Sequence, residues 1–480
     1  MTWTTRRASL FLLTVLPAVR AFAGEERPNL VLIFVDDLGW NGLGCTGSDF
    51  YETPNIDRLA REGMIFDNAY AGAGNCQPSR ACLLTGQYTP RHGVYAVGST
   101  KRGPAHRMRM IPVPSRKSIP DGNVTVAEAL AKAGYATGGF GKWHAGGAAR
   151  FQVSTSRKRR RDKGDDPKGL YSTTRAACEF IEKNRQRPFF AYVSHHAIHS
   201  PLKARPQTLA RFRGKKPGKQ HRDPLYAACT YDLDDGVGIL LKKLEELGLA
   251  RKTIVVFTSD NGGTPRSSQE PLRGAKGGYY EAGIREPFIV RWPGVVSAGS
   301  RCPVPVIHQD FYPTFLAVAG AGAPDGKVLD GESLLPLLRQ KGELARKSIF
   351  WHFPGYLNTA VPRGRDPLFR TRPVSVIRKG DWKLHLYHEE WVLDGGREKI
   401  ATSDAVELYD LKSDAGEREN LALSSTGKRD ELLGELLGWI DSCGAQLPSE
   451  RNPAYDPDKP AGKRKRERKR AGKKRTKESS

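Results

Sequence analysis

The stretch with the clearest potential for chemistry spans residues 75–87, where a thiol, a proline and an arginine stand at fixed offsets. Pro78 suits the first turn of a helix, so we expect Cys76 at a helix N-terminus, where free backbone N–H groups favour an anion. Arg80 adds a guanidinium that can bind a tetrahedral oxyanion through two hydrogen bonds. The segment therefore predicts an anion site, and the alternative is a buried structural cysteine followed by a helix.

Two apolar runs elsewhere in the chain each end in oxygen-bearing side chains. Residues 30–35 precede Asp36 and Asp37, and residues 253–259 precede Asp260 and Asn261. Both runs are typical of strands buried in a parallel sheet, and ligand sites in such sheets lie beyond the carboxyl ends of the strands. Four oxygen donors side by side favour a hard cation, Ca²⁺ or Mg²⁺. Taken alone, the first acidic pair is equally typical of a helix cap or turn.

Basic and imidazole side chains follow further expected strands. A strand over 135–140 leads to Lys142 and His144, and a strand over 187–193 leads to a loop that contains His199. Lys276 lies in a glycine-rich loop after the strand at 253–259. No cysteine or carboxylate stands at zinc-ligand spacing from the histidines, so a single histidine in acid–base catalysis is the better interpretation. Any one of these residues alone is more often an ordinary surface charge.

Taken in order, these motifs resemble the active-site set of the sulfatase family. The run Cys76-Gln-Pro-Ser-Arg80, continued by Leu84-Thr85-Gly86, is similar to the family signature, although Gln87 stands where the family usually has Arg. In that family the cysteine is oxidised after translation to formylglycine, whose hydrated aldehyde attacks sulfur. The resemblance covers residues 28–293 and returns at 378–383 and 408–412. The resemblance implies a maturation enzyme that converts Cys76 to formylglycine. The departure at Gln87 bears on how efficiently Cys76 is converted.

The resemblance also implies a role for each matching residue. Cys76 would supply the nucleophile, and Arg80 would anchor it. Lys142 and Lys276 would neutralise the sulfate, His144 would steer the hydrated aldehyde, and His199 with Lys276 would protonate the leaving oxygen. The implied cation is Ca²⁺, with Mg²⁺ as the alternative, and its ligands would be Asp36, Asp37, Asp260, Asn261 and the modified Cys76.

The wider chain predicts an α/β protein with four segments. Residues 1–23 carry the charge, apolar run and small-residue cleavage site of a signal peptide, which predicts export to the periplasm or the extracellular space. Residues 24–346 are expected to form a large, mixed, mostly parallel sheet sandwiched by helices, as in alkaline-phosphatase-like proteins. Residues 347–450 predict a smaller antiparallel sheet with a helix, and 451–480 a basic disordered tail. Helices are expected over 125–132, 233–247 and 429–440.

Charge and cysteine content add two observations. The formal net charge of the 480 residues is +25, and two basic runs, 157–163 and 463–480, contribute strongly to it. Such runs are usually solvated charge, and the functional alternative is contact with a polyanion. The seven cysteines form an odd number, which in an exported protein suggests that one of them has a separate role.

These observations predict a sulfatase that hydrolyses sulfate esters. The segment 145–169 is short for the family, which predicts an open cleft and a sulfated carbohydrate as the substrate. One alternative is a phosphodiesterase or phosphonate hydrolase of the same superfamily. The other is a non-enzymatic, polyanion-binding protein in which Cys76 is never modified.

Overall fold

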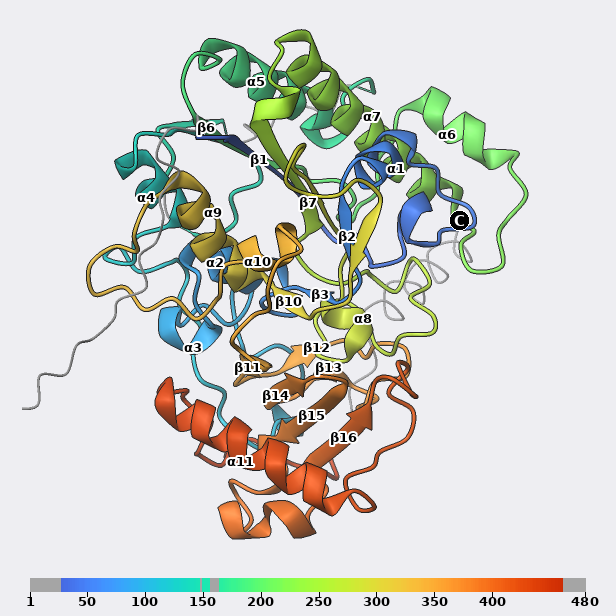
Figure 1. Cartoon of the computed structure of the whole chain (residues 1–480). Coiled ribbons are helices and arrows are strands. Elements are labelled where there is room, and N and C mark those ends of the chain that lie inside the picture. Colours follow the sequence, from blue (N-terminus) through green and yellow to red (C-terminus); the bar gives the residue numbers. More distant parts are fainter. Residues whose placement is uncertain (1–26, 147–148, 156–163, 461–480) are drawn as a thin grey trace, which may run out of the picture.

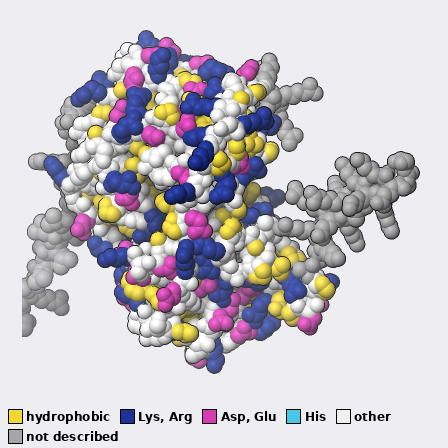
Figure 2. Space-filling model, turned by 90° about the vertical axis from the view of Figure 1, so that its right-hand side faces the viewer, with side chains coloured by type: hydrophobic (Ala, Val, Ile, Leu, Met, Phe, Trp, Pro, Cys, Tyr) yellow, Lys and Arg dark blue, Asp and Glu magenta, His cyan; other side chains and the backbone are white. Residues whose placement is uncertain are grey.

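The computed structural model describes residues 27–146, 149–155 and 164–460. The expected signal segment, 1–23, and both basic runs, 157–163 and 463–480, lie outside the described residues. Among the helices of the described part, none is long and apolar enough to span a bilayer. The face seen in Figure 2 carries Lys and Arg side chains interspersed with Asp and Glu side chains.

An eight-stranded main sheet forms the centre of the larger part of the molecule (Figure 1). Its strand order is β5-β4-β6-β1-β7-β8-β2-β9, and the run from β5 to β7 is parallel. The strands are β1 (Asn29–Val35), β2 (Met64–Phe66), β4 (Ala136–Gly141), β5 (Val153–Thr155), β6 (Phe189–Ser194), β7 (Thr253–Ser259), β8 (Phe288–Arg291) and β9 (Ser300–Cys302). All seven residues of β1 and of β7 are buried, as continuous apolar runs in a two-sided parallel sheet require.

Helices cover both faces of the main sheet. One face packs against α1 (Pro54–Arg61), α5 (Leu170–Lys183), α6 (Pro206–Arg213) and α7 (Pro224–Glu246). The other packs against α2 (Cys76–Thr85), α4 (Val126–Lys132), α9 (Phe311–Ala319) and α10 (Leu335–Leu338). Two short helices, α3 (Thr89–His92) and α8 (Glu281–Ile284), complete this part. Alternate residues of each central strand feed one of two apolar cores, which hold the sheet between its helical layers.

A second, four-stranded antiparallel sheet, called the C-terminal sheet below, has the order β11-β14-β15-β16. Its strands are β11 (Ser348–Phe353), β14 (Val374–Lys379), β15 (Trp382–Tyr387) and β16 (Val406–Asp410), and α11 (Thr426–Ser442) packs on it (Figure 1). Two small pairs, β3 (Ala69–Tyr70) with β10 (Val306–Ile307) and β12 (Leu357–Asn358) with β13 (Phe369–Thr371), lie between the two large sheets.

The sequence placed the central strands to within about two residues. It was less accurate for α7, which begins at Pro224 and not at residue 233. The Asp223 side chain caps this helix by accepting from the backbone N–H groups of Leu225 and Tyr226, and Pro224 occupies the first turn. Strands β2, β8 and β9 went unpredicted because each is too short to display a period.

Candidate active site

Four parallel strands deliver the candidate residues to one edge of the main sheet. β1 and β7 run in register from Asn29 opposite Thr253 to Val35 opposite Ser259, so the residues that follow them meet. The backbone N–H of Asp260 donates to the carbonyl of Val35 at 3.0 Å, and that of Asp37 donates to Asp260 Oδ1 at 3.2 Å. The two acidic strand ends, far apart in sequence, therefore form one cluster.

This cluster consists of Asp36, Asp37, Asp260 and Asn261, which are at most 2% exposed. Asn261 Nδ2 donates to Asp37 Oδ1 at 3.0 Å. Burial and the neighbouring Asp260 raise the pKa of Asp36 to about 7. The pKa of Asp260 is lowered: burial alone would raise it, but Arg80 and Lys142 outweigh that effect.

Two oxygen atoms of the cluster are orphans in the described part of the chain. Asp36 Oδ1 and Asn261 Oδ1 are buried and have no hydrogen-bond partner. Buried oxygens without donors are costly, and a carboxylate with an amide oxygen is a donor set that suits a hard divalent cation. Ligand atoms of Asp36, Cys76 and Asp260 lie within 4.8 Å of one another, and so do those of Asp36, Asp37 and His199. The residues present therefore fit a divalent cation.

Strained backbone marks the same place. Asp37 has φ of 69° and His144 has φ of 50°, in a region that side-chain-bearing residues seldom adopt. Such conformations persist only where the surrounding structure enforces them, and they concentrate at functional sites. Both residues were singled out from the sequence.

Helix α2 brings Cys76 and Arg80 against the acidic cluster. Cys76 is the first residue of this helix, as predicted, and all ten residues of the helix are buried. Cys76 is only 2% exposed, and this burial raises the pKa of its thiol. Pro78 is the third helical residue, still within the first turn. An unmodified thiol in this place is therefore a protonated, weak nucleophile.

The Arg80 guanidinium is fully buried and held on several sides. It pairs with Asp260 Oδ2 through Nη2 at 2.7 Å and Nε at 2.9 Å. Its Nη1 donates to the Lys142 carbonyl at 3.0 Å, to the Tyr192 hydroxyl at 3.1 Å and to Ser194 Oγ at 2.5 Å. Arg80 thus links α2 to the ends of β4, β6 and β7. Tyr192 and Ser194 were missed from the sequence, although their i, i+2 spacing places both on one face of β6.

Two lysines that are far apart in the sequence, Lys142 and Lys276, each contact a carboxylate of the cluster. Lys142 Nζ donates to Asp36 Oδ2 at 2.5 Å, and Lys276 Nζ pairs with Asp37 Oδ1. Lys276 Nζ also lies 3.9 Å from Cys76 Sγ. Burial opposes the charge of each lysine, but the adjacent carboxylates outweigh it, so both pKa values are raised and both side chains stay cationic.

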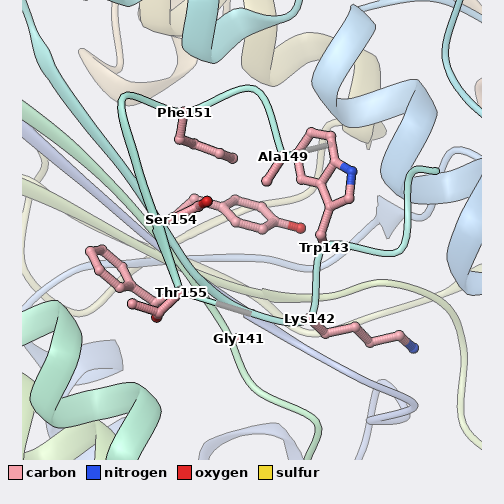
Figure 3. Close-up of a pocket in the computed structure, with 10 residues that line it drawn as sticks. Gly141, Lys142, Trp143, Ala149, Phe151, Ser154 and Thr155 are labelled. Carbon is pink, nitrogen blue, oxygen red and sulfur yellow. The ribbon is translucent and has the colours of Figure 1, made fainter. Parts of the chain in front are cut away.

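Lys142 and its neighbour Trp143 face different surroundings. Figure 3 shows Trp143 turned toward Ala149 and Phe151, while the Lys142 side chain extends away from that aromatic pocket. Trp143 Nε1 donates to the Gly146 carbonyl at 2.9 Å, and its ring meets that of Phe151 edge-on at 5.8 Å. The aromatic packing anchors the end of β4, which holds Lys142 in the direction of the carboxylates.

Three histidines lie around the cluster. His199 Nε2 is 4.0 Å from Asp37 Oδ2 with its side chain 40% exposed, and Lys168 Nζ donates to the His199 carbonyl. The pKa of His144 is lowered to about 3 by burial and by Lys142, so this ring is neutral. His196, which was not selected from the sequence, has Nδ1 3.8 Å from Asp36 Oδ2. Its place on the exit loop of β6 was the available signal.

Gln87, at the departure from the family signature, lies just beyond α2 and away from the carboxylates. Its Nε2 donates to the Val328 carbonyl at 2.8 Å, and its Oε1 accepts from Asn123 Nδ2 at 2.7 Å. Gln87 thus supports the loops around the end of the helix. Ser79, inside the signature, is bonded to His308 Nδ1 at 2.8 Å, and His308 in turn pairs with Glu286 at 2.5 Å.

All the residues selected from the sequence are therefore brought to one edge of the sheet. Three carboxylates, three cations and one thiol are thus linked in one cluster, in which a tetrahedral oxyanion would meet Lys142 and Lys276, while Arg80 is held by Asp260. Groups of this kind suit displacement at a sulfate or phosphate centre, because they stabilise charge on the equatorial oxygens.

Comparison with known proteins agrees with this geometry. The sulfatase family profile matches residues 28–321, and the profile for the C-terminal part of N-sulphoglucosamine sulphohydrolase matches residues 275–436. A sulfatase of Formosa agariphila is 33% identical, over 87% of this chain and 89% of its own. Arylsulfatase A of Homo sapiens is 32% identical, over 90% of each chain. The crystal structure of Ps i-CgsB in complex with k-i-k-neocarrahexaose has a TM-score of 0.69 at 27% identity, covering 88% of this chain and 95% of that one.

Proposed function

The chain belongs to the sulfatase family of sulfuric ester hydrolases, and from this we propose that it removes sulfate from a carbohydrate by way of a modified Cys76. One observation carries the proposal: the Cys76 sulfur lies beside Lys276 within a ring of buried carboxylates and cations. The complex of a 27% identical relative with an oligosaccharide supports a carbohydrate as the substrate class.

The nucleophile would be formylglycine made from Cys76 by a maturation enzyme. A buried thiol with a raised pKa is poorly suited to attack sulfur, so conversion gives this position a chemical purpose. The hydrated aldehyde would supply one hydroxyl for attack and a second whose deprotonation releases sulfate. Cys76 lies where the free N–H groups of α2 favour the negative charge that such a group would carry.

A divalent cation, Ca²⁺ or Mg²⁺, would be held by Asp36, Asp37, Asp260, Asn261 and the modified residue 76. It would supply Lewis acidity toward a sulfate oxygen and lower the pKa of the attacking hydroxyl. The orphan oxygens of Asp36 and Asn261 support this assignment.

The cationic side chains would bind and orient the sulfate. With the carboxylates committed to the cation, the charges of Lys142 and Lys276 become available to the ester. Arg80 stays fixed by Asp260 and holds the end of α2 in place.

His199 would protonate the leaving oxygen. Its side chain is 40% exposed and its Nε2 lies 4.0 Å from Asp37 Oδ2, so it could reach an ester bound beside that carboxylate. Burial lowers its pKa, whereas the negative charge of a bound ester would favour its protonated form. Neutral His144 would accept or donate a hydrogen bond without adding charge.

Two measurements test the proposal. The mass of the Cys76 peptide from protein produced with a maturation enzyme should be that of the aldehyde, which is lighter than cysteine. Sulfate release is then followed on sulfated glycans, a small aryl sulfate and matched phosphate mono- and diesters. Turnover of the aryl sulfate alone would reject a carbohydrate substrate, and faster phosphate release would favour the phosphodiesterase or phosphonate hydrolase alternative. Unmodified Cys76 with polyanion binding and no turnover would favour the non-enzymatic one.

A further inference from the structure

Arg370 lies over the loop that carries Lys276. It belongs to β13, in the small β12–β13 pair between the main sheet and the C-terminal sheet (Figure 1). Its Nη1 donates to the Lys276 carbonyl at 2.8 Å, and its Nε donates to the Asn358 carbonyl at 3.2 Å. The guanidinium therefore contacts the backbone of the residue whose side chain reaches Asp37.

Arg102 lies next to Arg370. Its backbone N–H donates to the Tyr356 carbonyl at 3.1 Å, which fixes residues 100–102 beside the start of β12. Arg102 is exposed and Arg370 is half-buried, so solvent and solutes reach the pair. The pKa of Arg370 is lowered, first by burial and then by repulsion from Arg102, while Asp37 acts in the opposite direction. Two like charges thus repel each other at the border of the site.

The neighbouring arginines show that this arrangement is unusual within its own segment. Arg365 pairs with Glu407 at 2.7 Å, and Arg372 pairs with Asp366 at 2.5 Å and with Glu389 at 2.7 Å. By contrast, no carboxylate of the described residues forms an ion pair or hydrogen bond with the guanidinium of Arg370 or of Arg102. In this segment, Arg365 and Arg372 are therefore neutralised by carboxylates, whereas Arg370, beside the Lys276 loop, is not.

We propose that Arg370 and Arg102 bind a second anionic group of the substrate, next to the sulfate that is hydrolysed. This inference rests on the proposed function and narrows it: the substrate is a saccharide with two anionic groups on the same or adjacent sugars. Sulfate and carboxylate share the chemistry that a guanidinium recognises, namely two oxygens placed for paired hydrogen bonds. Arg370 contacts the Lys276 loop through a backbone carbonyl and is proposed to bind the second anion, not the ester that reacts. It is therefore a specificity residue and not a catalytic one.

The test compares substrates that differ only in the second anion. The wild-type enzyme and the variants R370Q, R370K and R102A are assayed on monosulfated saccharides, on disulfated ones, on sulfated saccharides that carry a uronate carboxylate, and on a small aryl sulfate. We expect R370Q to lower kcat/KM for the dianionic saccharides by about 10- to 100-fold, mainly through KM, because a charged hydrogen bond is lost. The loss on the aryl sulfate should be at least about tenfold smaller. R370K should recover part of the loss, and R102A should show a smaller one.

Lys101→Ala provides the matched control, because Lys101 is an exposed cation adjacent to Arg102. It should leave every rate within about twofold of wild type. Whether disulfated or uronate-containing saccharides lose more in R370Q distinguishes the two sources of the second anion.

Two outcomes would overturn the inference. One is an equal loss for R370Q on all substrates, which would mean that Arg370 only supports the Lys276 loop. The other is a wild-type enzyme that hydrolyses monosulfated saccharides at least as well as dianionic ones. Failure of the proposed function has a different signature, since no substrate would then release sulfate. Titration of the C76A variant with the same saccharides gives affinities that do not depend on turnover, and R370Q in that background should weaken only the dianionic ligands.

Discussion

Two buried charge clusters can be compared in this protein. The first, called the catalytic cluster because we propose that it carries the reaction, contains Asp36, Asp37, Asp260, Arg80, Lys142 and Lys276 at the edge of the main sheet. The second, called the interdomain cluster here, joins α8 to the C-terminal sheet. In it, Lys383 Nζ lies 2.9 Å from both Glu281 Oε1 and Glu417 Oε1, and His385 Nε2 lies 3.2 Å from the latter. The four side chains of the interdomain cluster have no exposed surface.

The clusters differ in how completely their oxygens are bonded. In the interdomain cluster, Glu281 Oε2 accepts from Tyr70 and Glu417 Oε2 accepts from the Glu281 backbone, so each carboxylate oxygen has a donor. In the catalytic cluster, Asp36 Oδ1 and Asn261 Oδ1 have none. Equal burial thus accompanies a difference in bonding: the cluster whose carboxylate oxygens all have donors joins two parts of the chain, whereas the cluster with oxygens left over suits a ligand.

The sharpest way to test the catalytic role is C76A. Loss of the nucleophile should reduce turnover by at least about 10⁴-fold, while the free energy of unfolding changes by no more than about 1 kcal/mol. Sulfate release and thermal unfolding are the measurements. C82A is the matched control, because Cys82 is buried in the same helix but bonds to the Gly72 carbonyl and to His92. Persistent activity in C76A would refute the assignment of the nucleophile.

The interdomain cluster should respond most strongly to K383M. Removing the cation that contacts both Glu281 and Glu417 leaves the buried Glu417 without its lysine, while Glu281 keeps Arg285, and this should cost about 3–5 kcal/mol of unfolding free energy. Urea denaturation measures the loss. K379M serves for comparison, since Lys379 pairs with Glu431 and Glu435 near the surface and should cost far less. Equal losses in the two variants would show that the buried cluster contributes no special stability.

Asp36→Asn should affect function and not stability, the opposite of the effect expected for K383M. We expect loss of the bound cation and at least about 10²-fold lower activity, without loss of stability in metal-free protein, because a crowded negative charge has been removed. Metal content after dialysis and the effect of a chelator on the Tm measure this. E417Q should keep its metal. If D36N also retained a full equivalent of cation, the ligand assignment of Asp36 would be wrong.

The smallest effect concerns pH. Burial and Glu281 raise the pKa of Glu417 from its ordinary 4.5 to about 7, although Lys383 opposes them. Between these values the folded protein holds a proton that the unfolded chain releases, so this group makes the free energy of unfolding fall as pH rises from about 4.5 to 7. Replacement by Gln should remove about 1–3 kcal/mol of that fall. The measurement is urea unfolding at several pH values, and parallel curves for wild type and E417Q would contradict the assignment.

Much of the site could be predicted because strand ends converge. Once the runs before Asp36 and Asp260 were recognised as buried parallel strands, their meeting at one edge followed from sheet topology. The position of Cys76 at the start of α2 followed from the local sequence. These inferences depended on signals within a few residues of each functional group.

The remainder depends on contacts that no local pattern encodes. Lys383 and Glu281 are 102 positions apart, and Arg370 and Lys276 are 94 apart, with no spacing or period to connect them. The start of α7 was placed late because the apolar stripe of that helix begins after its capped first turns. Tertiary packing decides such features, and only the three-dimensional structure reveals them.

The loop from Leu272 to Glu281 has a consequence for engineering this enzyme. Although it carries Lys276 into the catalytic cluster, Arg273 donates to the Tyr409 hydroxyl and the Glu417 carbonyl, and Glu281 is held by Lys383. The loop that carries Lys276 thus reaches its final position only when the C-terminal sheet has packed against it. A truncation before β11 would not yield a minimal enzyme, and exchanging the last hundred or so residues between homologues would require transplanting the partners of this loop as well.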